Sequence, residues 1–317
     1  MALGFGYNSY IGVGTEGTYG TPATRTVFVE HNGETLAQAD DVIEGNSVYR
    51  SEQDVDNFTQ ARKTVGGNFT LDVRYEGAEK FVLQAMGTSA TTTMITGSAY
   101  KHIFSLADDL PVGLCLEVDR DVSNFLYHGV KINTMTLSQD NTGILNASFD
   151  VICEDEGTVA ATTPSFSTTD YFMFDDAVVA YDGTTQAIKS LSLSLNNSLT
   201  TDRYQFGSRL TKEPERSGRI EVTGDMEVEF DGTINWSRFK DAGTGSLSAT
   251  YTGATISGTA ANLFVIKCPH VRLSGGVPNV SDSGMISVTV PFKAYADGTA
   301  LTSRLMQIEW TNTASSV

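Results

Sequence analysis

The sequence predicts a mainly β protein made of two tandem β units, each with one short flanking α-helix. Two observations lead to this prediction. Stretches in which apolar and polar residues alternate recur along the chain, as half-buried strands require. A strand-like stretch followed by a helix-like stretch then occurs twice, about 150 residues apart, which indicates an internal duplication.

In the first unit, the alternating stretches cover residues 69–75 and 145–151. Residues 77–87 have apolar positions at helical spacing and end on a glycine, which is typical of a helix C-cap. In the second unit, the strand-like stretches are residues 190–195, 220–230 and 286–292. Residues 234–242, which end before Gly243, are the second predicted helix.

The two units correspond in order as well as in pattern. A glycine-containing pair, Gly66-Gly67 or Ser217-Gly218, precedes the strand before each helix. Residues 143–151 match 284–292 as a turn followed by an alternating strand. The Thr-rich segment 157–169 has no strand pattern and is the expected boundary. We therefore expect domains at residues 1–160 and 161–317.

The overall charge excludes ordinary nucleic-acid binding. The chain has 38 acidic and 21 basic residues, for a net charge of -17, and such a surface repels phosphates. Residues 1–160 carry a net charge of -13 and the remainder -4. No apolar run approaches the roughly 20 residues of a membrane-spanning helix, and no targeting pattern opens the chain, so we expect no membrane contact.

The sequence contains little evidence for a catalytic site or a cofactor-binding site. The Gly12–Gly17 segment fits G-x-G-x-x-G, but a turn follows it where a dinucleotide fold needs a helix, so we interpret it as a flexible N-terminal arm. The four histidines are scattered, and no metalloprotease, hydrolase or P-loop motif occurs. Cys115, Cys153 and Cys268 predict buried free thiols in a reducing cytoplasm. We expect no enzyme activity, cofactor or metal.

Acidic residues alternate along one predicted strand of the second unit. Glu221, Asp225, Glu227 and Glu229 share its polar face, and Asp72 has a comparable place in the first unit. Two readings stay open for them: a solvated sheet face, or a negative surface lining a passage, where repulsion keeps a polyanion from sticking.

Two blocks resemble the tail tube (major tail) proteins of long, non-contractile-tailed bacteriophages. The first is Glu16-Gly17-Thr18-Tyr19-Gly20-Thr21-Pro22-Ala23, which leads into a strand at residues 26–30. The second is Gly66-Gly67-Asn68-Phe69-Thr70-Leu71-Asp72-Val73-Arg74-Tyr75-Glu76-Gly77, followed by the first predicted helix.

This resemblance implies β-sandwich or barrel units that form rings, whose inner sheets join around a lumen and whose long loops reach the adjoining ring. The loop would be the charged segment 40–63, with 202–216 as its equivalent. The residues expected in these inter-ring or inter-subunit contacts are Arg50, Glu52, Asp54, Asp56, Arg62, Arg203, Arg209 and Arg216. Their arginines suit salt bridges to the acidic first unit. Asp72 and the four acidic residues of 221–229 would face the lumen.

The resemblance also implies a structural virion protein that is made in the bacterial cytoplasm, polymerises around a tape-measure protein, meets terminator and tip proteins, and conducts DNA. Since single-unit members form hexamers, two units per chain favour trimeric rings with pseudo-sixfold order, with hexamers as the other possibility. The alternatives from other classes are a carbohydrate-binding or adhesin-like β-sandwich, which needs a pocket with aromatic platforms, and a hydrolase on a β scaffold.

Overall fold

The computed structural model describes residues 3–45, 58–96, 98–229, 244–274, 287–296 and 305–317. The strands of the first half are β1 (Tyr10–Thr15), β2 (Val27–Val29), β3 (Gly33–Glu34), β4 (Ala37–Glu44), β5 (Phe58–Asp72), β6 (Gly87–Thr96), β7 (Ala99–Leu106), β8 (Leu114–Asp119), β9 (Asn124–Asp140), β10 (Asn146–Cys153) and β11 (Asp155–Val159). Those of the second half are β12 (Ala177–Tyr181), β13 (Thr184–Thr185), β14 (Ile188–Asn196), β15 (Glu221–Glu229), β16 (Thr244–Ser257), β17 (Ala260–Leu273), β18 (Ser287–Ala294) and β19 (Gln307–Asn312). The helical elements are α1 (Glu79–Met86) and the 3-10 turns η1 (Gly6–Asn8) and η2 (Phe174–Asp176).

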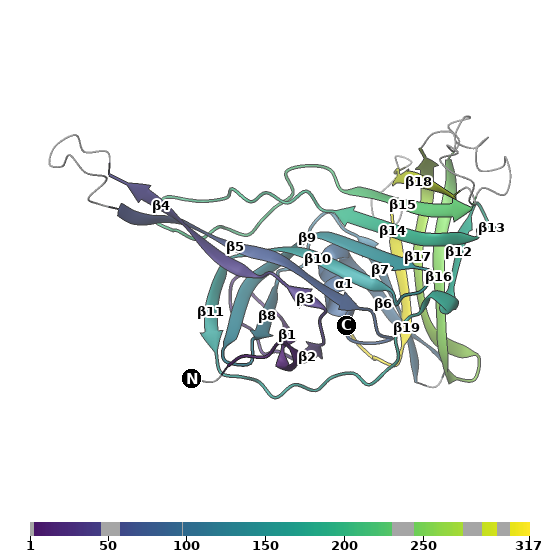
Figure 1. Cartoon of the computed structure of the whole chain (residues 1–317), viewed down its shortest axis with the longest axis horizontal. Helices are drawn as coiled ribbons and strands as arrows, with labels where there is room; N and C mark the ends of the chain where they lie inside the picture. The colour runs from purple at the N-terminus through teal and green to yellow at the C-terminus, as the bar shows by residue number, and fades with distance from the viewer. Residues whose placement is uncertain (1–2, 46–57, 97, 230–243, 275–286, 297–304) are drawn as a thin grey trace.

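Two runs of antiparallel strands dominate the architecture (Figure 1). The first has the order β5-β10-β9-β14-β15-β18. The second has the order β12-β16-β17-β19-β7-β6. Each run contains strands from both halves of the sequence, joined at β9–β14 in one and at β7–β19 in the other. The halves therefore share hydrogen-bonded sheets.

The core is one cluster of buried apolar side chains from both halves. Phe69, Phe81 and Phe149 pack together with ring centroids 5.0–5.2 Å apart, which fixes α1 against the first run of strands. Trp310 of β19 is fully buried, and its indole Nε1 donates to the carbonyl oxygen of Tyr75 at 2.9 Å. The C-terminal strand is thus fastened beside the start of α1.

The mainly β fold and the first helix are confirmed. The helix ends at Gly87, whose φ of 105° lies in a region that favours glycine. The helix predicted at 234–242 lies outside the described residues. All three cysteines are buried and free. Within the described ranges, no helix is both long and apolar enough to span a membrane.

Two local predictions were wrong. The Gly12–Gly17 segment is no flexible arm, because residues 10–15 form β1, a mostly buried strand that pairs with β2 and β8. The two ends of the expected loop at 40–63 are strand as well: residues 40–44 and 58–63 belong to the β4–β5 hairpin, in which Asp40 and Lys63 are cross-strand partners, and residues 46–57 lie outside the described residues. Alternation along β4 is weak because nearly all its side chains are exposed, so the sequence pattern concealed this strand.

We expect Glu79→Gln to weaken the pH dependence of folding stability. Burial raises the pKa of Glu79 to about 6, although Gly77 N and Asn312 Nδ2 donate hydrogen bonds to its carboxylate. As the pH falls from 7 to 5, the folded chain takes up a proton that the unfolded chain binds only near pH 4.5, which stabilises the fold by about 1 kcal/mol. Urea unfolding at pH 7 and pH 5, with Glu229→Gln as an exposed control, measures this gain. An equal gain in Glu79→Gln and wild type would refute the assignment.

We expect Gly224→Ala to destabilise the fold by about 1–3 kcal/mol. A Cβ at Gly224 would lie 2.2 Å from the carbonyl oxygen of Ser192 and 2.5 Å from Cζ of Phe292, so the Phe292 ring occupies the space that a side chain would need. Gly157→Ala in β11 is the matched control, because a Cβ there meets nothing within 4 Å. Thermal unfolding of the two variants compares them, and equal melting temperatures would show that β15 tolerates the methyl group.

Candidate functional site: a polar sheet face and a projecting arm

One face of the β5-β10-β9-β14-β15-β18 sheet carries polar side chains across its full width. Cross-strand partners point to the same side of an antiparallel sheet, so the pairing register defines rows on that side. The rows are Asp72-Asn146-Ser138-Ser192-Asp225-Pro291, Thr70-Ser148-Thr136-Ser194-Thr223-Lys293, Asn68-Asp150-Thr134-Asn196-Glu221 and Asp140-Ser190-Glu227-Thr289. We call these residues the polar face. The intervening residues point into the core.

The polar face is strongly acidic. It brings together Asp72, Glu221, Asp225 and Glu227, while Glu229 follows in the same alternation, opposite Ser287. Asp140 and Asp150 also lie on it, and the sequence interpretation missed both because their strand partners were unknown. Among the described side chains of these rows, the single cation is Lys293, whose Nζ donates to Glu221 at 2.9 Å.

Many polar groups on this face bond to one another. Asn68 Nδ2 donates to Ser148 Oγ at 2.8 Å, and Thr136 Oγ1 donates to Ser194 Oγ at 3.2 Å. Asp72 Oδ1 accepts hydrogen bonds from Asn32 Nδ2 at 2.8 Å and Asn146 Nδ2 at 3.2 Å. The face therefore combines negative charge with hydroxyl and amide groups, some of which bond to one another.

A long hairpin of β4 and β5 projects from the end of this sheet and forms the arm (Figure 1). The segment between β14 and β15 runs along it. Arg209 Nη2 pairs with Asp40 at 2.7 Å, and Arg209 Nε donates to the carbonyl oxygen of Ala61 at 2.7 Å. Tyr204 Oη donates to the carbonyl oxygen of Lys63 at 3.0 Å. The arm is therefore supported along one side by residues of the second half.

The arginines predicted for inter-subunit contacts have partners within the chain. Arg62 pairs with Asp202 at 3.0 Å and Arg203 with Glu215 at 2.7 Å. Arg216 donates to the carbonyl oxygen of Ala107 at 2.6 Å and to Asn197 Oδ1 at 2.8 Å. Arg209 makes the expected type of bridge to the acidic first half, but inside one chain. Arg50, Glu52, Asp54 and Asp56 lie outside the described residues.

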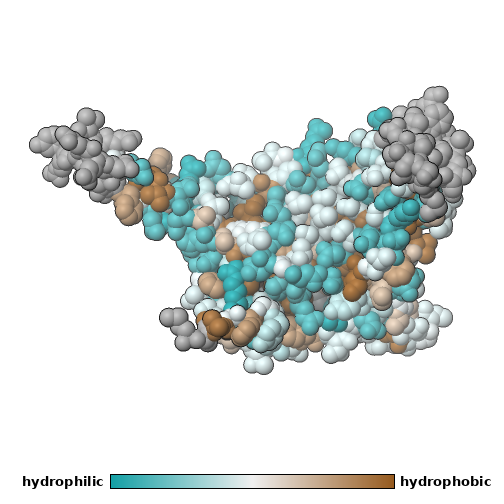
Figure 2. Space-filling model, in the orientation of Figure 1, coloured by the Kyte–Doolittle hydropathy of each residue, from teal (hydrophilic) through white to brown (hydrophobic). Residues whose placement is uncertain are grey.

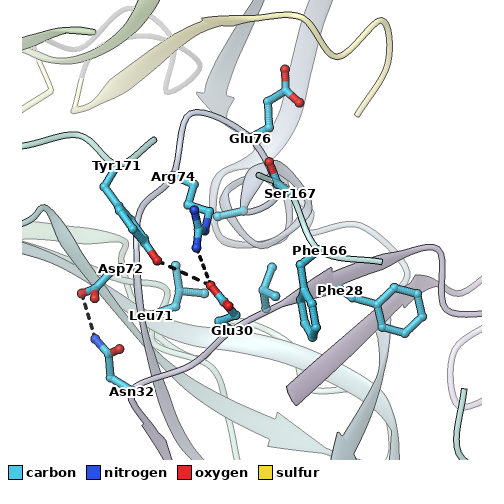
Figure 3. A pocket seen from close by; sticks show the side chains of 13 residues that line it. Phe28, Glu30, Asn32, Leu71, Asp72, Arg74, Glu76, Phe166, Ser167 and Tyr171 are labelled. Carbon is cyan, nitrogen blue, oxygen red and sulfur yellow. Dashed lines mark hydrogen bonds and ion pairs between the residues drawn. The ribbon is translucent and has the colours of Figure 1, made fainter. Parts of the chain in front are cut away.

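A small hollow beside Asp72 shows how the segment between the halves is held (Figure 3). The Arg74 guanidinium lies 4.1 Å from the ring centroid of Tyr171, and its Nη2 pairs with Glu30 at 2.5 Å. The hollow encloses about 40 Å³, which is far below the several hundred Å³ typical of ligand pockets. Its residues fasten the segment around Tyr171 to the first half.

A buried carboxylate fastens another part of the same segment. Glu117 is fully buried and accepts hydrogen bonds from Arg25 Nε at 2.6 Å, Tyr10 Oη at 3.0 Å, Asn124 Nδ2 at 3.0 Å and Thr162 N at 2.9 Å. Burial alone would raise the pKa of Glu117, but the hydrogen bonds from Thr162, Arg25 and Tyr10 hold it below its usual value. This cluster could not be predicted from the sequence, because most of its members lie far apart along the chain.

The block at residues 16–23 has a structural role. The buried Glu16 carboxylate accepts hydrogen bonds from Gly129 N at 2.7 Å and Gly20 N at 2.9 Å. Gly129 has a φ of 63°, and a Cβ there would lie 2.9 Å from the Tyr19 ring, so this turn requires glycine. The block therefore locks the loop after β1 onto β9. Within the described part of the chain, no cluster of His, Cys, Asp or Glu could hold a metal ion.

Comparison with known proteins gives one family. A family model for phage tail tube proteins matches residues 6–294, which include the whole polar face and the whole arm. No curated protein matches the sequence.

Proposed function

Since the chain belongs to the phage tail tube protein family and is thus a structural component of phage tails, we propose that it polymerises into stacked rings whose polar face lines a channel for DNA. The observation that carries this proposal is the continuity of the acidic polar face across both halves of the chain. A surface that belonged to one half alone would end at β9; this one continues through β14 to β18.

Passage of DNA along such a wall would be passive. Carboxylates of Asp225 and Glu227 form no ion pair with the described residues and would repel phosphates throughout the channel. We propose no catalytic activity, since the family is structural.

For the ring, we propose two tandem β units per chain, as predicted for residues 1–160 and 161–317. Support comes from matching strand pairs: β10 pairs with β5 in the first unit as β18 pairs with β15 in the second. A long connection precedes β5 in the first unit and β15 in the second. The β9–β14 pairing joins the units within the chain. A similar join between chains would close the wall and cover exposed sheet edges. Three chains would then give six units, with a hexamer of chains as the alternative.

For stacking, we propose that the arm is the inter-ring contact. It extends well beyond the sheet, and its shaft is braced by the Arg209–Asp40 ion pair. Assembly would take place in the bacterial cytoplasm around a tape-measure protein, with terminator and tip proteins at the ends.

Negative-stain electron microscopy of the purified full chain at rising concentration tests the proposal. We expect rings and tubes with a central hole, and threefold averages would establish the trimer. A chain that gives no rings or tubes at any concentration, even with tail tips added as initiators, would contradict it.

A further inference from the structure

The sequence contains a single Asn-Gly pair, Asn32-Gly33, and it lies beside the polar face. Asn32 is exposed, and Gly33 begins the two-residue strand β3. Asparagine is one of the thermolabile residues of proteins. Its side-chain amide is lost most readily before glycine, because no Cβ keeps the next backbone nitrogen away from it. The pair therefore combines a reactive side chain with the neighbour that hinders it least.

The side chain of Asn32 is bound to the polar face. Its Nδ2 donates to Asp72 Oδ1 at 2.8 Å, as Figure 3 shows, and its backbone nitrogen donates to the carbonyl oxygen of Thr70 at 2.8 Å. Asp72 Oδ1 also accepts the hydrogen bond from Asn146 Nδ2 at 3.2 Å. The Asn32 amide thus supplies a donor to a carboxylate at the start of the first row of the polar face, and a carboxylate in its place would repel Asp72.

Few contacts hold the backbone around this pair. β3 forms two residue pairs with β5, Gly33 with Thr70 and Glu34 with Phe69. A Cβ at Gly33 would meet nothing within 4 Å, so the space beside this backbone is open. β3 lies near the centre of the view in Figure 1, where hydrophilic residues predominate on the surface in Figure 2. Short exposed pairings open at a low cost in free energy, so the Gly33 nitrogen can leave the sheet while the rest of the chain stays folded.

We propose that Asn32 is a site of spontaneous deamidation in the folded chain. The Gly33 nitrogen gives its proton to solvent and attacks Asn32 Cγ; a C–N bond forms, and Nδ2 leaves as ammonia. Water then opens the cyclic imide at either carbonyl carbon, which gives aspartate or isoaspartate without oxidation or reduction. Either product replaces the donor to Asp72 with a carboxylate, so the polar face gains a negative charge as the chain ages. The reaction needs a single chain and does not depend on assembly.

Peptide mapping by mass spectrometry of the folded full-length chain, incubated at mildly alkaline pH, tests the site. We expect the exchange of NH for O at position 32 to be faster than at Asn141, which is also exposed but precedes Thr142. In Gly33→Ala, whose methyl group meets nothing in the fold, we expect the modification at position 32 to be lost. Equal rates at Asn32 and Asn141, equal modification in Gly33→Ala, or modification only of urea-unfolded chain would overturn the proposal.

Asn32→Asp tests the effect on Asp72, because it supplies one product of the reaction from the start. We expect a lower melting temperature than that of the wild type at pH 7, since two carboxylates then stand where a donor met an acceptor. Gln205→Glu makes the same charge change at another exposed position and should leave the melting temperature unchanged. An Asn32→Asp variant as stable as Gln205→Glu would overturn the proposed effect on Asp72.

Discussion

Replacement of Glu221, Asp225, Glu227 and Glu229 by lysine is expected to give the chain a salt-dependent affinity for DNA that we expect the wild-type protein to lack. The four side chains follow one another along β15 and share a side of the sheet. The change places four cations beside Lys293, on a surface that otherwise carries Ser, Thr and Asn. Four phosphate contacts predict that affinity falls about a hundredfold between 50 and 200 mM salt.

The matched control reverses four exposed acidic residues away from that strand: Asp41, Glu44, Asp170 and Asp175. Both quadruple variants have the same net charge, so any difference between them reports on where the charge lies. Fluorescence anisotropy with a labelled duplex over a salt series measures the binding. Equal binding by the two variants would mean that net charge alone prevents DNA binding. The position of the four acidic residues along β15 would then have no effect on it.

Removal of the buried Glu117 carboxylate by Glu117→Ala is expected to cost about 3–5 kcal/mol of folding stability. The variant leaves the Arg25 guanidinium, which is mostly buried, without its anion, and it frees Tyr10, Asn124 and the Thr162 amide from their shared acceptor. Since the folded-state pKa of Glu117 is lowered, its contribution is present above pH 4.5 and fades as the pH falls through that lowered value.

Glu30→Ala is a stringent control for this prediction. Its ion pair with Arg74 is equally short, at 2.5 Å against 2.6 Å for Arg25–Glu117, but the Glu30 side chain is 56% exposed and that of Glu117 is 0% exposed. We expect a loss of less than about 1 kcal/mol for Glu30→Ala. Urea unfolding at pH 7 measures both losses. Similar losses would show that burial does not set the strength of these pairs.

Most of the correct predictions came from the local alternation of apolar and polar residues along the strands. Ser190–Leu195 alternates strictly because β14 has the core on one side, and the same logic placed Asp72 and Asp225 on polar strand faces. Their presence in one row could not be predicted, because it depends on β9 pairing with β14, a contact between strands about fifty residues apart.

Buried polar clusters escaped the sequence interpretation for a related reason. The partners of Glu117 come from four separate parts of the chain, and no local pattern marks a charge that folding will bury. Arg209 has its partner Asp40 in the same chain, at a separation of 169 residues, so its place in a contact between subunits stays a prediction. A charge pattern identifies complementary surfaces, whereas the topology decides whether they belong to one copy or two.

A helical reconstruction of assembled tubes by cryo-electron microscopy tests the central proposal most directly. We expect the inner wall to consist of β5, β10, β9, β14, β15 and β18, with the rows through Asp72, Asp225 and Glu227 pointing into the channel. A tube whose channel is lined by another surface, with this polar face turned outward or buried between rings, would contradict the proposal.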